Sequence, residues 1–131
     1  MAPWRYLTSE ELIILGAAHG VGPVIKPEGL QAAIAAPAAS FAGVDRHPEI
    51  SDKAAALAFA IAKIYHPFLD GNKRVAAIGM MATCWLNGFR PKVLQSELVG
   101  FIMAVAELNV DESDDDTARA DLAGLLRMRM D

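Results

Sequence analysis

The amino-acid sequence predicts an all-α protein, a compact bundle of about six helices in a single domain spanning residues 1–131. Hydrophobic residues make up 53% of the chain, and many of them are alanines, which favour helices and let helices pack closely. Short polar turns containing Gly, Pro or Asn separate the apolar stretches. The strand signal is weak and confined to Arg90–Leu94.

The first helix has a clear start and end. Thr8 with Glu11 three residues later forms a capping-box pattern, and an apolar stretch follows. The sequence Gly20-Val21-Gly22-Pro23 ends that helix.

The second helix is expected to run from Pro27 or Glu28 and to end before Pro37. The following residues, 38–48, predict an irregular segment. Within it, Phe41 is expected to anchor the chain onto the core.

Two apolar helices form the predicted centre of the bundle. The first is expected to have Ser51 as its N-cap and contains no helix breaker from Ala54 to Tyr65. It is apolar nearly all round, which is typical of a buried helix. The second begins near Gly71 or Asn72 and extends to Leu86, where Asn87-Gly88 supplies a C-terminal signal.

Two further helices, over residues 96–108 and 116–128, complete the bundle. The acidic stretch Asp111–Asp116 between them is interpreted as a solvated turn that favours the start of the last helix. The single cysteine, Cys84, excludes an internal disulfide and a multi-cysteine zinc site, and its apolar surroundings predict burial.

Composition also narrows the partners and the location. The net charge of -4 gives no long-range attraction for nucleic acid, so no direct nucleic-acid partner is expected. The longest apolar runs are shorter than the roughly 18 residues that cross a bilayer. The N-terminal sequence lacks the pattern of a signal peptide. We therefore expect a cytoplasmic protein with no membrane partner.

The segment His66–Arg74 concentrates the polar chemistry of the chain. His66 follows the first central helix, where a histidine can simply interact with the helix dipole; alternatively, its usual pKa of about 6.5 suits a general base. Asp70 could cap the next helix, or it could help to hold magnesium beside a phosphate. Phe68 is expected to plug into the core and fix the loop between them.

The sequence Gly71-Asn72-Lys73-Arg74 predicts an anion site at a helix N-terminus. Gly71 allows close approach of a ligand, and Asn72 can donate through its amide. The cations Lys73 and Arg74 oppose the helix dipole at this end, so a bound phosphate explains them better than a structural role. Other phosphate motifs, such as a P-loop, are missing from the sequence, and His19 and His47 lack metal-ligand spacing.

The nine residues His66-Pro-Phe-Leu-Asp-Gly-Asn-Lys-Arg74 resemble the signature of the Fic/Doc superfamily. Lys73, where Fic adenylyltransferases have a second glycine, makes the chain similar to the death-on-curing (Doc) branch. The likeness extends to Gly29–Ile34, Lys53–Leu57 and Leu86–Phe89, and covers roughly residues 8–126.

This resemblance implies a Fic-fold bundle whose active-site loop joins the two central helices. It implies a toxin of a toxin–antitoxin pair, a kinase that transfers the γ-phosphate of ATP to a protein hydroxyl, with a threonine of elongation factor Tu as the target. ATP and Mg²⁺ would be required, and an antitoxin would be the partner. His66 would be the base, Asp70 would hold Mg²⁺, and Gly71 and Asn72 would lie against the phosphates, with Lys73 and Arg74 neutralising charge.

Three positions depart from the family pattern, and two alternatives stay open. Ala77 stands where Fic signatures have a second arginine, which counts against AMP transfer. Ile64 replaces a common basic residue, and Val75 replaces a common threonine. The alternatives are a Fic-type adenylyltransferase and a Fic-fold interaction module without activity.

Overall fold

The computed structural model describes residues 3–108 and 115–130, so most of the acidic stretch Asp111–Asp116 lies outside the described residues. The helices and strands, in chain order, are α1 (Ser9–Ala18), α2 (Pro27–Ala35), a 3-10 turn η1 (Ala36–Ala38), β1 (Ser40–Phe41), β2 (Val44–Asp45), α3 (Ile50–Phe59), a π-helical segment η2 (Ala60–Tyr65), α4 (Asn72–Leu86), α5 (Gln95–Leu108) and α6 (Asp115–Met128).

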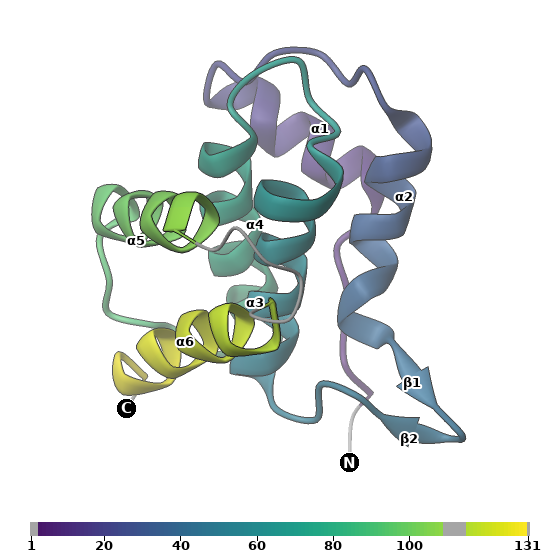
Figure 1. Ribbon diagram of the computed structural model, residues 1–131, viewed down its shortest axis with the longest axis vertical. Helices are drawn as coiled ribbons and strands as arrows, with labels where there is room; N and C mark the ends of the chain where they lie inside the picture. The colour runs from purple at the N-terminus through teal and green to yellow at the C-terminus, as the bar shows by residue number, and fades with distance from the viewer. Residues whose placement is uncertain (1–2, 109–114, 131) are drawn as a thin grey trace.

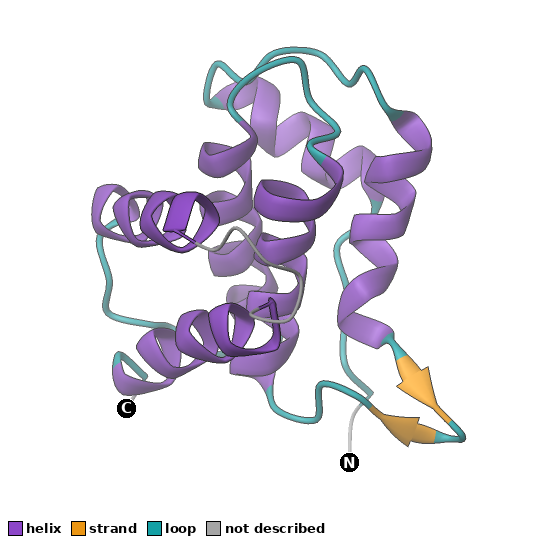
Figure 2. Ribbon diagram, in the orientation of Figure 1, coloured by secondary structure: helices purple, strands orange, loops and turns teal. Residues whose placement is uncertain are grey.

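The architecture is an all-α bundle, as the sequence predicts. Helices α3 and α4 form its centre, with α1 and α2 on one side and α5 and α6 on the other (Figure 1). The two strands form only a small hairpin, which projects at the end of the molecule opposite the loop that joins η2 to α4 (Figure 2).

Small residues bring the central helices close together. Ala54, Ala58 and Ala76 are completely buried. A Cβ added at Gly79 of α4 would lie 3.2 Å from side-chain atoms of both Leu12 and Leu57. The alanine-rich composition therefore forms tightly packed helices rather than a core filled by large side chains.

Most helix boundaries follow the local signals. Thr8 and Glu11 form the complete capping box of α1, with hydrogen bonds of 3.1 and 2.9 Å. Helix α2 has proline in its first turn, and α4 begins at Asn72 after Gly71. Gly88, after the end of α4, has a left-handed φ of 85°.

The predicted start of the first central helix was wrong by two positions. Glu49 is the N-cap of α3, and Ser51 is buried inside the first turn rather than capping it. Ile50 is only 6% exposed and belongs to the core. Its packing extends the helix beyond the residue with the best capping side chain.

The expectation for Phe41 was also wrong. Phe41 is 81% exposed and pairs with Val44 across the hairpin. Ala42 and Gly43, with φ of 52° and 79°, make the two-residue turn that directs this pair toward solvent. Residues 90–94 form no strand; they lie in a loop held by a 2.8 Å hydrogen bond from Lys92 N–H to the Arg129 carbonyl.

Two further expectations can be compared with the structure. Cys84 is completely buried, and burial raises the pKa of its thiol to about 12. Among the described residues, none of the helices has the length and apolar character needed to span a bilayer.

Candidate functional site

The unusual end of the first central helix presents His66. Helix α3 continues into the π-helical segment η2, and the His66 N–H bonds to the Ile61 carbonyl five residues earlier, at 3.2 Å. His66 itself adopts the left-handed conformation, with φ 44° and ψ 57°. Such a conformation is costly for a residue other than glycine, and π-helical turns are frequent at functional sites. The chain thereby turns sharply, and His66 is exposed and lines a pocket.

The loop after His66 is held by the buried side chain of Phe68 and by hydrogen bonds from the side chain of Asn72. Phe68 is 2% exposed and lies in the core, where the sequence placed it. The Asn72 side chain accepts a hydrogen bond from Phe68 N–H and donates one to the Phe68 carbonyl, both at 2.9 Å. The amide donor expected to reach a phosphate is thus bonded to the loop backbone, and Asn72 acts as an internal clasp.

Asp70 and Gly71 lie between this clasp and α4. The Asp70 carboxylate accepts a 2.8 Å hydrogen bond from Gly22 N–H, which is 48 positions away in the sequence. Gly71 has a left-handed φ of 76°, and a Cβ there would lie 3.1 Å from a Val21 methyl group. Both the backbone angle and the close approach of Val21 therefore favour glycine.

The predicted polar residues meet around one pocket of about 390 Å³. Residues from the loop and the first turn of α4 form one wall, and two side chains of α5 form another. The lining residues are His66, Asp70, Gly71, Asn72, Lys73, Arg74, Val99 and Met103. The pocket thus combines a base, a carboxylate, two cations and the N–H groups of a helix N-terminus with an apolar side.

The segment between α1 and α2 lies alongside the loop (Figure 2). The Leu69 N–H donates to the Pro23 carbonyl at 2.8 Å, and Val24 and Phe68 form an antiparallel bridge. Arg74 Nη1 donates to the His19 carbonyl at 3.1 Å. Two charged residues of the pocket, Arg74 and Asp70, are therefore held by this one segment.

The side chains of the His66 pocket suit a magnesium ion that is bound together with substrate phosphates. No group of three or more His, Cys, Asp or Glu side chains arranged for a metal occurs among the described residues. The pocket offers a single carboxylate, that of Asp70, next to two cations. This suits Mg²⁺ carried by substrate phosphates, which needs only one or two protein carboxylates, and does not suit a metal bound by protein ligands alone.

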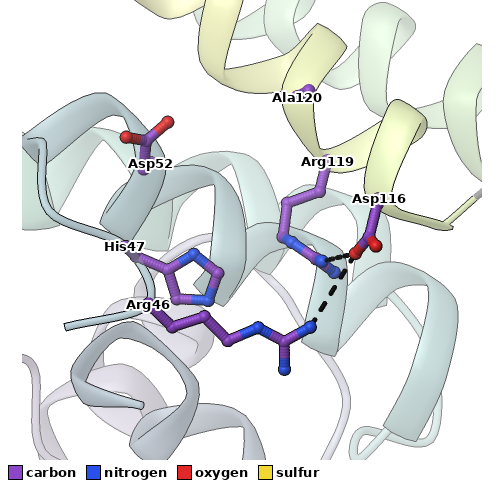
Figure 3. A pocket seen from close by; sticks show the side chains of 6 residues that line it. All are labelled: Arg46, His47, Asp52, Asp116, Arg119 and Ala120. Carbon is purple, nitrogen blue, oxygen red and sulfur yellow. Dashed lines mark hydrogen bonds and ion pairs between the residues drawn. The ribbon is translucent and has the colours of Figure 1, made fainter. Parts of the chain in front are cut away.

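A second pocket, of about 350 Å³, lies near the hairpin end of the molecule (Figure 3). Arg46 and Arg119 both form ion pairs with Asp116 there. His47 lines the same pocket, and burial, reinforced by these two guanidinium groups, lowers the pKa of its imidazole. Because its cations are already paired with a carboxylate, this pocket is a weaker anion site than the one at His66.

The residues outside His66–Arg74 that line the pocket or hold its side chains were not predicted from the sequence. Gly22 and the His19 carbonyl contribute backbone groups, which have no residue signature. Val99 and Met103 line the pocket from a helix whose sequence looks ordinary. Gly22 lies in the predicted helix break, and that is the one signal that the sequence offers for any of them.

Comparisons with known proteins identify the family of this chain. The model of the Fic/DOC family matches residues 7–84, which include the whole segment from His66 to Arg74. The chain is also 33% identical over 113 residues to a protein named Toxin Doc from Mycolicibacterium smegmatis, a match covering 85% of this chain and 76% of that protein. The family match spans more than half of the chain, and the chain belongs to the Fic/DOC family.

Proposed function

We propose that this protein is a Doc-like toxin that transfers the γ-phosphate of ATP to a protein hydroxyl. The observation that carries the proposal is the pocket itself, in which Lys73 and Arg74 stand at a helix N-terminus beside His66. Cations, free backbone N–H groups and a base are the groups that phosphoryl transfer requires, since that reaction depends on positioning and charge stabilisation. A threonine of elongation factor Tu is the proposed acceptor, on the strength of the resemblance to the Doc branch.

The reaction that we propose has one base and one leaving group. A His66 ring nitrogen takes the proton of the acceptor hydroxyl while that oxygen forms a bond to the γ-phosphorus. The bond between the γ-phosphorus and the oxygen bridging to the β-phosphate breaks, and ADP leaves. Lys73 and Arg74 stabilise the charge that develops on the phosphate oxygens.

Asp70 is the residue that would hold Mg²⁺ in this pocket. When bound with the nucleotide, the ion neutralises phosphate charge. The protein's own contribution is to aim the carboxylate and to supply the first-turn N–H groups of α4. The apolar surface of Val99 and Met103 can accept the base or ribose of the nucleotide.

Phosphate transfer is favoured over AMP transfer by the identity of two residues. Lys73 adds bulk and charge inside the pocket. Ala77 is completely buried and is not among the pocket residues, so this position does not supply the second arginine of Fic signatures. The test is incubation with elongation factor Tu and ATP labelled at the α or the γ position. Label on protein from the γ position alone is expected, and label from the α position would establish the adenylyltransferase alternative.

The two other departures from the family pattern lie away from the pocket. Val75 is completely buried, and Ile64 lines a different pocket together with Lys26 and Tyr65. Neither Ile64 nor Val75 lines the His66 pocket, whose polar residues are all present. This favours an active enzyme over an inactive interaction module.

Induced expression separates activity from inactivity. Growth arrest is expected for the natural sequence and should vanish in His66→Ala, because loss of a general base costs on the order of 10²–10⁴ in rate. Gly124→Ala is a matched control, since a Cβ there meets nothing within 4 Å. If the natural protein, His66→Ala and Gly124→Ala all leave growth unaffected, the result would favour the interaction module without activity.

We further propose an antitoxin partner that covers an apolar groove of about 300 Å³ between α1, α4 and the start of α5. Trp85 and Leu94 line it and are 51% and 73% exposed. An apolar or amphipathic segment is the matching chemistry. Leu94→Asp should abolish rescue by the co-expressed antitoxin. Phe41→Asp changes another highly exposed apolar position, on the hairpin, and should leave rescue intact. Rescue that survives Leu94→Asp would place the antitoxin elsewhere.

A further inference from the structure

The segment between α1 and α2 holds the catalytic loop through its backbone. Ile25 N–H and Lys26 N–H both donate to the Pro67 carbonyl, at 2.8 and 3.1 Å. Together with the bond from Leu69 N–H to the Pro23 carbonyl, these interactions fix residues 23–26 against residues 67–69. The position of Gly22, immediately before this paired stretch, is therefore determined by several bonds and not by one.

Gly22 lies so close to the Asp70 carboxylate that a side chain on Gly22 would displace the carboxylate. Its N–H lies 2.8 Å from Asp70 Oδ1, and a Cβ on Gly22 would lie 2.4 Å from the same oxygen and 3.3 Å from the Asp70 backbone nitrogen. The φ of Gly22 lies outside the left-handed region, so backbone conformation does not demand glycine here. The carboxylate itself is what excludes a side chain.

We propose that Gly22 is a positioning residue for Asp70: its N–H engages Oδ1 and thereby fixes the carboxylate so that Oδ2 is the oxygen left for the ligand of the pocket. A hydrogen bond to one oxygen removes the equivalence of the two and restricts rotation of the side chain. This inference rests on the proposed function only in taking that ligand to be a magnesium nucleotide. The contact and its steric requirement stand independently of it.

The segment between α1 and α2 also contacts the start of α4. Arg74 Nη1 donates to the His19 carbonyl, three positions before Gly22. Gly71, next to Asp70, lies so close to Val21 that an added Cβ would be 3.1 Å from a Val21 methyl group. Gly22 therefore belongs to a segment that contacts three residues of the pocket wall, Asp70, Gly71 and Arg74. Among these contacts, the hydrogen bond to Asp70 is the one that orients a carboxylate.

Gly22→Ala tests the proposal by nucleotide binding. Calorimetric titration with a non-hydrolysable ATP analogue, at a series of Mg²⁺ concentrations, should give a magnesium-dependent affinity about tenfold or more weaker than in the natural protein, as expected when a hydrogen bond to a charged group is lost. Gly124→Ala is the control for the same change in an open position and should bind as the natural protein does. Unchanged magnesium-dependent binding in Gly22→Ala would overturn the proposal.

A second measurement examines the contact without any nucleotide. The Gly22 amide proton resonance and its hydrogen exchange should change strongly in Asp70→Ala and much less in Asp70→Asn, whose side-chain oxygen can still accept the bond. An amide unaffected by Asp70→Ala would overturn the contact. If the amide responds but the natural protein binds no magnesium nucleotide, the positioning contact holds and the proposed function fails.

Stability gives an answer even if Gly22→Ala folds poorly. The steric conflict involves the Asp70 carboxylate, so the unfolding cost of Gly22→Ala should shrink markedly in the Asp70→Ala background. Urea unfolding of the two single variants and the double variant measures this coupling. Strictly additive costs would show that Gly22 and Asp70 do not interact and would overturn the proposal.

Discussion

Individual side chains in the loop divide the work between structure and chemistry. Asn72, which the sequence alone assigns to phosphate binding, uses both of its polar side-chain atoms on the backbone of Phe68. His66, Asp70 and the two cations are left to face the pocket. Asn72, which lies between Asp70 and Lys73 in the sequence, thus holds the loop in the conformation that presents its neighbours to the pocket.

Asn72→Ala should therefore lower stability as well as activity. Two neutral hydrogen bonds are lost, each contributing about 0.5–1.5 kcal/mol, so the free energy of unfolding should fall by roughly 1–3 kcal/mol. Urea unfolding measures the change. Asn72→Asp is the informative comparison, because its carboxylate can still accept from Phe68 N–H but cannot donate to the Phe68 carbonyl. Stability equal to that of the natural protein in both variants would contradict the clasp.

Cys84 should be unreactive in the folded protein. It is completely buried, and its thiol pKa of about 12 leaves very little thiolate near pH 8. A thiol reagent at pH 8 should label the native protein only at the rate of its unfolding and should label it rapidly in urea. Fast labelling without denaturant would show that α4 opens locally around Cys84.

At the scale of the element, local signals fix most helix ends because the groups that make them are close in the chain. Thr8 and Glu11 satisfy each other's backbone donors within one turn, and the proline of α2 needs only its own fixed φ. The burial of Ser51 and Ile50 depends instead on segments packed from elsewhere, which no local pattern specifies. The exposure of Phe41 follows from a tight turn at Ala42-Gly43 that was not recognised in the sequence.

The same distinction separates the predicted part of the site from the missed part. His66 to Arg74 is recognisable because its chemistry is contiguous in the sequence. Gly22 enters through a backbone N–H, and Met103 through a helix whose docking on α4 decides what it faces. The π-helical segment that turns His66 into the pocket also has no signature in the apolar run Ala54–Tyr65.

Thr8→Ala tests the contribution of the capping box to α1. The hydroxyl of Thr8 accepts from Glu11 N–H, and its loss should reduce the free energy of unfolding by about 1 kcal/mol. Thr8→Ser keeps the acceptor and should retain most of the stability. Thermal unfolding compares the three proteins, and an equal loss in both variants would indicate packing of the threonine methyl group rather than capping.

At the scale of the whole molecule, one buried cation connects distant segments. Lys53 of α3 is completely buried, its Nζ donates to Asp45 Oδ2 at 2.7 Å and to the Pro37 carbonyl at 3.3 Å, and it lies over the rings of Trp4 and Tyr6. Burial alone would lower the pKa of Lys53, but the hydrogen bonds with Asp45 and Tyr6 outweigh it and raise the pKa. The N-terminal segment and the hairpin are thereby fastened to the central helix.

Lys53→Ala should destabilise the molecule by about 2–4 kcal/mol, because it leaves a cavity and removes the partner of Asp45. Asp45 is 40% exposed in its side chain and can regain water, which keeps the loss below that for a fully buried pair. Lys53→Met fills the volume without the charge, so its loss in urea unfolding should be smaller, and the difference between the two variants gives the packing contribution. Equal losses in the two variants would assign the effect to the charge alone.

The pocket near the hairpin, lined by Arg46, His47 and Arg119, is expected to make stability depend on pH. Burial, with Arg119 and Arg46 nearby, lowers the pKa of His47 below its usual value of 6.5, while Asp52 opposes the shift and Lys53 adds to it. Below pH 6.5 the unfolded chain therefore binds a proton that the folded protein resists, and stability falls as the pH decreases toward the folded pKa.

Unfolding in urea between pH 7.5 and 5 should show this loss in the natural protein and a shallower loss in His47→Gln. The carboxyl of Asp45, whose pKa is lowered from 3.8 by Lys53, titrates below this window and does not confuse the comparison. Arg46→Gln removes one exposed guanidinium and should move the His47 titration, followed by NMR of its ring protons, toward higher pH. A His47 pKa at or above 6.5 in the natural protein would contradict the buried, cation-flanked environment that the structure gives this residue.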